Sequence, residues 1–275
     1  MPWDVRFNIG SKLLEFDLLK NMRNDQIMDN NEYSGLISHS AYSKLAMPTK
    51  YLCDQIQDGI DNDVDAILIN PAIACNAFFK NGIEQAQLIG QKKMEYLFTR
   101  LGFGDYANAT LPYYSFIMCS YIIAKKQFWD VYFDFVEEIL SNAKKIANQE
   151  EPFAKAYYGE SDYKLKTGFD YRPFIIERIP QILINKFNMK LKFVESPKMT
   201  YAVKFGPNAK LIHQLYELKK LVLDDPDKFK IWDEFRQPFL MNQALCYKII
   251  SRGEFNRSQE QLKENIKFIK DGEFV

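Results

Sequence analysis

An almost unbroken apolar run covers residues 114–124, and an amphipathic helical pattern over residues 126–148 follows it directly. A strand that is apolar at nearly every position is typical of the middle of a sheet covered on both faces. A second buried strand, residues 64–70, ends at Pro71, and residues 83–101 after it have helical spacing. Strands that alternate with helices in this order predict an α/β fold, with a mainly parallel or mixed sheet flanked by helices.

The rest of the pattern divides the chain into two regions. Short strands and further helices are predicted over residues 33–38, 190–194, 12–24, 48–57 and 172–187. Residues 150–170 are polar and weakly periodic, which predicts a loop. Near the end the pattern is only helical, over residues 208–223, 228–235, 238–251 and 258–270. We therefore predict an α/β domain over residues 1–200 and a helical C-terminal region over residues 201–275.

Charge, cysteine content and hydropathy limit the classes of function. The chain has 36 Lys and Arg against 36 Asp and Glu, which argues against broad binding of nucleic acid, because that needs an excess of cations. Its 4 cysteines are scattered without a CxxC pair, as expected for reduced thiols in a cytosolic protein. No apolar run approaches the roughly 20 residues that span a bilayer, so we predict no transmembrane segment and at most a peripheral membrane association.

The absence of several familiar motifs excludes the chemistries that depend on them. The sequence has no GxGxxG, no GxxxxGK[ST] and no GxSxG. Its 2 histidines, His39 and His213, are too few for a His-rich metal site. The polar start of the chain carries no signal-peptide pattern, and its abruptness suggests a piece of a longer protein.

Two segments, residues 114–129 and 172–183, combine features that recur together. The first is the apolar run that passes straight into a Lys-Lys-x-Phe-Trp helix, and the second is an apolar helix with an Arg…Glu-Arg pattern. An earlier pattern comprises Tyr33, Gly35, Ser38 and Lys44. In this order the segments resemble the core of bacterial surface-polysaccharide glycosyltransferases. The resemblance covers roughly residues 12–195 and implies an A-type-like glycosyltransferase fold with an abbreviated N-terminus.

This resemblance implies that the chain transfers a sugar from a nucleotide-activated donor to a saccharide acceptor during capsule or lipopolysaccharide biosynthesis. The implied location is the cytoplasm, with the inner face of the membrane as a second possibility. Two alternatives stay open. One is a non-catalytic domain that binds a glycan or a partner transferase. The other is a transferase that moves a phospho-group onto a capsular sugar.

The polar loop after the first strand offers groups that suit a sugar-nucleotide donor. Ser38, His39, Ser40 and Lys44 supply hydroxyls, an imidazole and an ammonium group. Such groups hold diphosphates and sugar hydroxyls. The alternative is an ordinary polar loop between a strand and a helix.

Two asparagines extend the predicted donor site. Asn70 closes the second strand, and Asn76 lies before the next helical pattern. The amino end of a helix that faces a cleft binds anions through its free N–H groups. The alternative for Asn76 is a helix cap.

Asp63 and Asp65 are the weak candidates for a metal site. Oxygen ligands two residues apart suit Mg²⁺ or Mn²⁺ bound to the diphosphate of a donor. The pair precedes its strand, however, whereas ligands of open parallel sheets bind at the carboxyl ends of strands. The favoured interpretation is therefore a solvated turn between a helix and a strand.

Charged residues inside the apolar helix of residues 172–187 form the predicted catalytic set. One hypothesis makes Glu177 the general base for an acceptor hydroxyl, while Arg172 or Arg178 neutralises the departing diphosphate. The alternative is a structural Arg–Glu pair, because a charge on a buried face needs a partner.

Overall fold

The computed structural model describes residues 13–37, 41–88, 91–161, 168–222 and 225–250, together with residues 263, 265 and 267. Its centre is a four-stranded mixed sheet in the order β1-β3-β2-β4. The strands are β1 (Ser34–Gly35), β2 (Ala66–Ile69), β3 (Ile122–Ala124) and β4 (Leu191–Val194). Strand β2 is parallel to β4, and β3 is antiparallel to both β1 and β2. The prediction of an α/β fold with a mixed sheet is confirmed at this level.

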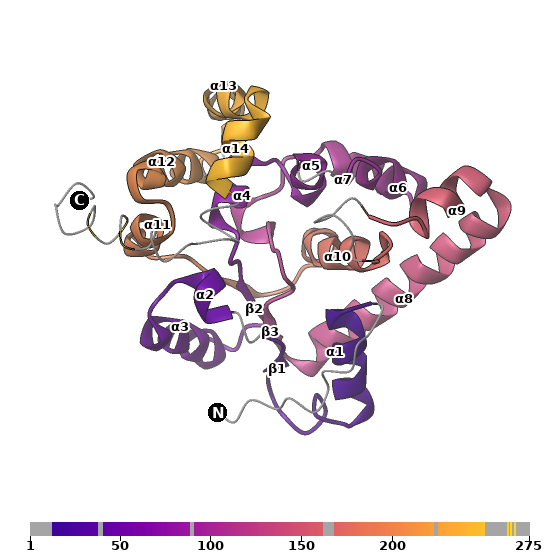
Figure 1. The fold of residues 1–275 in the computed structure, drawn as a ribbon. Helices are drawn as coiled ribbons and strands as arrows, with labels where there is room; N and C mark the ends of the chain where they lie inside the picture. Colours follow the sequence, from indigo (N-terminus) through magenta and orange to yellow (C-terminus); the bar gives the residue numbers. More distant parts are fainter. Residues whose placement is uncertain are drawn as a thin grey trace.

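Helices make up most of the described chain and surround the sheet (Figure 1). They are α1 (Glu15–Asn24), α2 (Ala41–Leu45), α3 (Thr49–Asp61), α4 (Ile73–Phe78), α5 (Gly82–Leu88), α6 (Met94–Arg100), α7 (Gly104–Asn108), α8 (Lys126–Gln149), α9 (Glu151–Tyr157), α10 (Arg172–Lys186), α11 (Lys198–Phe205), α12 (Ala209–Lys220), α13 (Pro226–Met241) and α14 (Gln243–Ile250). In the part of the chain that the structure describes, no helix has both the length and the apolar character needed to cross a membrane.

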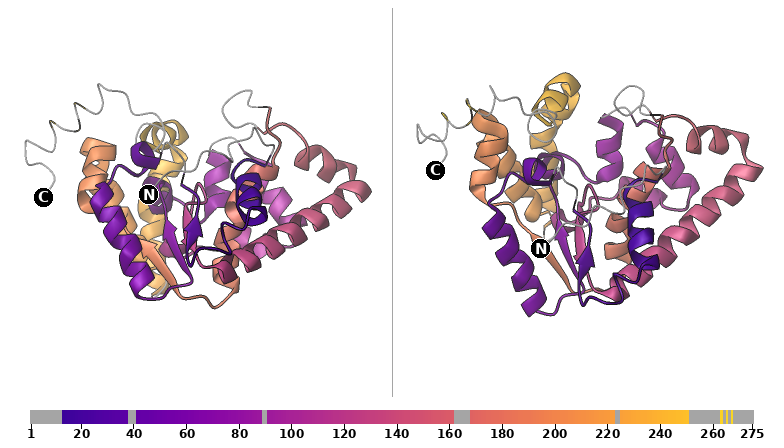
Figure 2. Two further views of the ribbon diagram at one scale, coloured as in Figure 1. Left: turned by 90° about the horizontal axis from the view of Figure 1, so that it is seen from below. Right: turned by 60° about the horizontal axis from the view of Figure 1, so that its bottom comes forward.

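The alternation of side chains along β2 explains the layers. Ala66 and Leu68 pack into one hydrophobic cluster with residues of α1, α8 and α10. Ile67 and Ile69 pack into another cluster with residues of α2. Successive side chains of a strand point to opposite faces, so β2 is buried on both. Figures 1 and 2 show α2 and α3 on one side of the sheet and α1, α8 and α10 on the other.

The apolar run of residues 114–124 is mostly not a strand, which corrects the prediction. Only Ile122–Ala124 is extended, because the backbone of Cys119 and Ser120 turns into the left-handed region, with φ of 62° and 50°. Residues 116–118 are nevertheless buried. The apolar pattern therefore reports burial of an irregular segment rather than strand geometry.

Several other boundaries also differ from the prediction. The first strand has two residues instead of residues 33–38, and the helical pattern of residues 83–101 divides into α5 and α6. Helix α9 lies in the predicted loop of residues 150–170, and α11 was not predicted at all. Helix α13 continues through Pro238, where two helices were expected. The helix predicted for residues 258–270 lies mainly outside the described residues.

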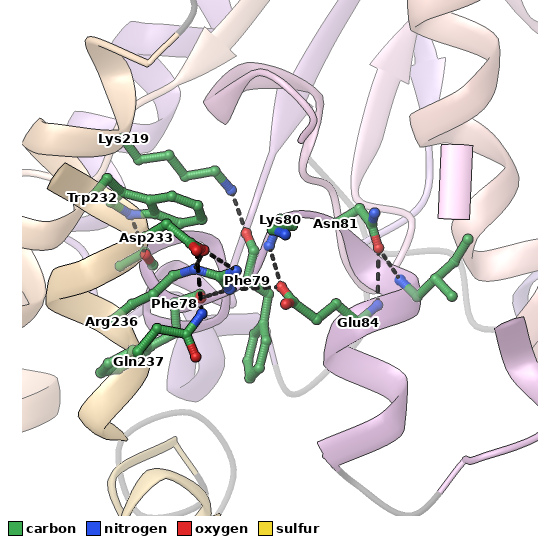
Figure 3. A network of polar contacts seen from close by, with 12 residues as sticks. Phe78, Phe79, Lys80, Asn81, Glu84, Lys219, Trp232, Asp233, Arg236 and Gln237 are labelled. Atoms are coloured by element: carbon green, nitrogen blue, oxygen red, sulfur yellow. Dashed lines mark hydrogen bonds and ion pairs between the residues drawn. The ribbon is translucent and has the colours of Figure 1, made fainter. Parts of the chain in front are cut away.

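The C-terminal helices pack on α4, the helix that follows β2. Buried side chains of α4, α11, α12, α13 and α14 form one hydrophobic cluster. At the carboxyl end of α4, Lys219 donates to the Phe79 carbonyl oxygen (2.6 Å), and Arg236 donates to that of Phe78 (2.9 Å). Trp232 donates to the Ala77 carbonyl oxygen at 3.0 Å. These donors satisfy carbonyl groups that a helix end leaves without intrahelical partners (Figure 3).

Candidate functional site

One edge of the sheet collects the segments in which the sequence predicts chemistry. Strands β1, β2 and β4 run in the same direction, so their carboxyl ends lie together, and β3 begins at this edge. The loops into α2, α4 and α11 therefore start beside the segment that enters β3. Crevices outside the carboxyl ends of strands are the usual ligand sites of open α/β sheets.

Lys44, on the short helix α2, lies half-buried at this edge. Its Nζ is 3.8 Å from the Cys119 Sγ and 5.8 Å from the centre of the Tyr121 ring. Burial by itself lowers the pKa of Lys44, but the neighbouring Cys119, Tyr121 and Glu15 outweigh burial and raise it. Lys44 therefore carries a positive charge at neutral pH.

Glu177, from α10, reaches the same point from the other side of the sheet. Its Oε1 accepts a hydrogen bond from the Cys119 backbone N–H at 3.0 Å, and its Oε2 lies 3.4 Å from the Arg178 Nη1. The side chain is 24% exposed, so a ligand can still approach the carboxylate. Cys119 thus joins the two predicted residues, since its thiol contacts Lys44 and its amide holds Glu177.

The backbone that carries Cys119 is strained. Cys119 and Ser120 both have left-handed φ, and so does Ala46, two residues after Lys44, with φ of 51°. Non-glycine residues adopt this conformation at an energetic cost, and such strained residues cluster at functional sites. Here the turn points the Cys119 amide at Glu177.

The Cys119 thiol itself stays protonated at neutral pH. Burial, followed by the nearby charge of Glu177, raises its pKa to about 12. A thiol is a nucleophile only as the thiolate. Cys119 therefore serves as a neutral contact between Lys44 and Glu177.

The two predicted arginines have structural partners. Arg178 is 2% exposed, and it donates to the Gly82 carbonyl oxygen (2.7 Å) and the Gln85 Oε1 (2.9 Å), which fastens α5 to α10. Arg172 forms a bidentate pair with Asp170, in which its Nε donates to Oδ1 (3.0 Å) and its Nη2 donates to Oδ2 (2.6 Å). Lys44 and Glu177 therefore both contact Cys119 at the sheet edge, whereas Arg172 is held by Asp170.

The predicted donor asparagines are also engaged inside the protein. Asn70 is buried, and its Oδ1 accepts from the Ala72 N–H at 2.9 Å, which shapes the turn after β2. Asn76 donates to the Tyr113 carbonyl oxygen (2.8 Å) and accepts from Lys219 (3.2 Å). Ser38, His39 and Ser40 lie outside the described residues.

Asp63 and Asp65 lie at the opposite edge of the sheet, before β2 begins. Asp63 is paired with Lys125, and this hydrogen bond and charge lower the pKa of Asp63. Asp65 accepts from the Gln127 side chain (3.0 Å) and the Lys190 N–H (2.8 Å). These positions do not fit a metal ion on a donor bound near Lys44. Within the described ranges, no group of three or more His, Cys, Asp or Glu residues forms a metal-ligand set.

Lys204 is a residue of this edge that sequence reasoning missed. Its buried ammonium group donates to the carbonyl oxygens of Lys44 (2.9 Å) and Pro71. It thereby ties the segment after β1 to the turn after β2. The available signal was a lysine inside the apolar stretch of residues 201–205.

Comparison with known proteins adds no neighbour: no protein-family model, no curated protein and no solved structure matches the chain. Any interpretation of the site's chemistry therefore depends on the groups that the structure places at this edge of the sheet. These are an ammonium group, a carboxylate and a strained backbone turn that positions both.

Proposed function

We propose that the protein is a glycosyltransferase with an A-type-like fold, which transfers a sugar from a nucleotide-activated donor to a saccharide acceptor. The observation that carries this proposal is the convergence of Lys44 and Glu177 on Cys119 at the carboxyl edge of the sheet. Lys44 lies 75 residues before Cys119 in the sequence, and Glu177 lies 58 residues after it. The resemblance of the sequence to surface-polysaccharide glycosyltransferases supports the same conclusion and favours an acceptor of capsule or lipopolysaccharide type.

Each group of the pair has a distinct task in this reaction. The Lys44 ammonium faces the diphosphate of the donor and neutralises the charge that builds up as the nucleotide departs. The Glu177 carboxylate accepts a hydrogen bond from the acceptor hydroxyl and directs its oxygen toward the anomeric carbon. The Cys119 N–H fixes the carboxylate in place, so the geometry exists before the substrates bind.

Binding of donors tests the proposal. We expect one of a panel of UDP-, GDP-, CMP- and dTDP-sugars, with or without Mn²⁺, to raise the melting temperature, since a ligand at 100 times its Kd stabilises a fold by about 2.7 kcal/mol. Lys44→Met removes the ammonium group but keeps the length of the side chain, and it should abolish this shift.

Lys50→Met is the matched control. Lys50 is exposed on the neighbouring helix α3 and pairs with Asp54, so the variant should keep the donor-induced shift. A well-folded wild-type protein that responds to no donor in the panel contradicts the proposal and favours a non-catalytic domain.

A further inference from the structure

Helix α2, which carries Lys44, is too short to fix the position of that lysine by itself. It has only 5 residues, and isolated helices shorter than about 12–15 residues are marginal in water. A helix also leaves the carbonyl groups of its last turn without intrahelical partners. Contacts from elsewhere in the fold must therefore hold the backbone of Lys44.

Thr200 and Lys204 of α11 supply such contacts at the carboxyl end of α2. The Thr200 hydroxyl donates to the Ala46 carbonyl oxygen at 3.3 Å, and the Lys204 ammonium group donates to that of Lys44 at 2.9 Å. The two donors are four residues apart, so they lie on one face of α11, the helix beside α2 in Figure 1. Both side chains are at most 1% exposed, so both hydrogen bonds start from groups that are shielded from water.

Lys204 also reaches the turn that follows β2, where it donates to the Pro71 carbonyl oxygen. Asn70 holds this turn from within, because its Oδ1 accepts a backbone N–H two residues later. The Lys204 Nζ therefore joins the segment that carries Lys44 to a turn with a shape of its own. Through this bridge, the loops after β1 and β2 keep a fixed separation at the carboxyl edge of the sheet.

Other side chains of α11 anchor this helix in the C-terminal hydrophobic cluster. Tyr201, Ala202 and Phe205 are buried there together with side chains of α4 and α12. Packing of this kind resists displacement, because protein interiors are as dense as crystals of small organic molecules. Helix α11 is thus fixed by its apolar side chains and holds α2 through the two hydrogen-bond donors.

We infer that Thr200 and Lys204 are positioning residues, which hold Lys44 where its ammonium group can bind the diphosphate of the donor. This inference rests on the proposed glycosyl transfer, in which Lys44 faces that diphosphate. The stem of a lysine is flexible, so the place of the Lys44 backbone decides which points its charge can reach. The C-terminal helices consequently contribute to donor binding through α11.

The first arm of the test measures hydrogen exchange by mass spectrometry, and it needs no ligand. Thr200→Val keeps the size of the side chain and removes the hydroxyl, whereas Thr200→Ser keeps the hydroxyl. The Ala46 N–H bonds to the Tyr42 carbonyl oxygen within α2. We expect Thr200→Val to speed exchange in peptides that span residues 41–47 by about 5-fold, the equivalent of one hydrogen bond. Thr200→Ser should exchange like wild type, and peptides from α8 should stay unchanged in both variants.

The second arm measures the Kd of the UDP-, GDP-, CMP- or dTDP-sugar that raises the melting temperature of wild type. We expect Lys204→Met to raise this Kd by about 10–100-fold, because a displaced Lys44 loses a hydrogen bond between charged groups. Thr200→Val should raise it about 5-fold, and Thr200→Ser should stay within about 2-fold of wild type.

Lys198→Met, at the exposed start of α11, is the matched control and should keep the wild-type Kd. The Kd separates positioning from a merely structural role, because it describes the folded molecules. A residue that only stabilises the fold would lower the melting temperature and leave the donor Kd unchanged.

The outcomes separate the two claims. Unchanged exchange of residues 41–47 in Thr200→Val, or an unchanged donor Kd in Thr200→Val and Lys204→Met, overturns the positioning role and leaves the glycosyltransferase proposal intact. If Lys204→Met does not fold, Thr200→Val and Thr200→Ser decide by themselves. If wild type binds no donor, the proposed function fails and the positioning role fails with it. Faster exchange with weaker donor binding in Thr200→Val, both restored in Thr200→Ser, supports both claims.

Discussion

At the scale of single residues, buried cations hold this chain together. Arg178, Lys204, Lys219 and Arg236 are each at most 2% exposed. Each of them donates to backbone carbonyl oxygens in a turn or at a helix end. Burial of a charge is costly unless hydrogen bonds satisfy it. These side chains therefore fix the turns beside the candidate site more tightly than apolar residues would, because each bond has a defined direction.

Lys219 should make the stability of the protein depend on pH. Burial, with smaller effects of neighbouring charges, lowers its pKa to about 7, whereas a lysine in the unfolded chain has a pKa of about 10.4. Above pH 7 the unfolded state thus binds more protons, and stability rises by up to about 1.4 kcal/mol per pH unit. Lys219→Met should flatten this rise between pH 7 and 8, which urea midpoints at the two pH values measure.

Lys230→Met provides the comparison for Lys219. Lys230 lies exposed on α13, so its removal should leave the pH dependence of wild type unchanged. If the urea midpoint changed equally with pH in wild type and in Lys219→Met, Lys219 would not be the group whose protonation makes stability depend on pH.

At the scale of elements, the short strands depend on close approach of their backbones. Gly35 in β1 pairs with Ile123 in β3, and a Cβ at Gly35 would overlap the Ile122 carbonyl oxygen. Backbone atoms of a central strand cannot move aside as a flexible side chain can. Glycine at this position therefore allows β1 to join the sheet and places the start of the loop toward Lys44.

Gly35→Ala should destabilise the protein by about 3 kcal/mol, at the upper end of the cost of overpacking. The reason is the overlap with main-chain atoms of β3. Gly104→Ala is the matched change, because its Cβ would lie 3.5 Å from the Thr99 Cγ2, an ordinary contact. That variant should stay within about 1 kcal/mol of wild type in a urea titration. Similar losses in both variants would argue against the tight β1–β3 contact.

At the scale of the whole molecule, the hydrophobic clusters on the two sides of the sheet share its strands. Strand β2 contributes to two of these clusters, and α4, directly after β2, is the centre of the third. The C-terminal helices complete this third cluster through Trp232 and Arg236 (Figure 3). Loss of these helices would expose α4 next to the candidate site.

We therefore expect residues 13–250 to unfold in a single transition, which also tests the predicted boundary between residues 200 and 201. In a Trp3→Phe background, Trp129 reports on the α8 cluster and Trp232 on the C-terminal cluster. With either one left as the single tryptophan, fluorescence and far-ultraviolet circular dichroism should give the same urea midpoint. A Trp232 fluorescence transition at lower urea than the dichroism transition would indicate a separate C-terminal domain.

The sequence by itself determined the features that depend only on neighbouring residues in the chain. Helices α8 and α10 and the buried strand β2 follow from apolar periodicity, because each buries a face whose pattern is complete within the segment. Lys44 and Glu177 were also recognisable as charges beside a strand end and within an apolar helix. Their roles in donor and acceptor binding remain predictions.

Only the tertiary structure decided which of these residues meet. Cys119 joins Lys44 and Glu177 across separations of 75 and 58 residues, through a left-handed turn inside an apolar run that had predicted a strand. The same long-range packing commits Arg178 to α5. Local periodicity records whether a residue is buried. The partners that a buried charge finds depend on segments far away in the sequence, and folding alone brings those segments together.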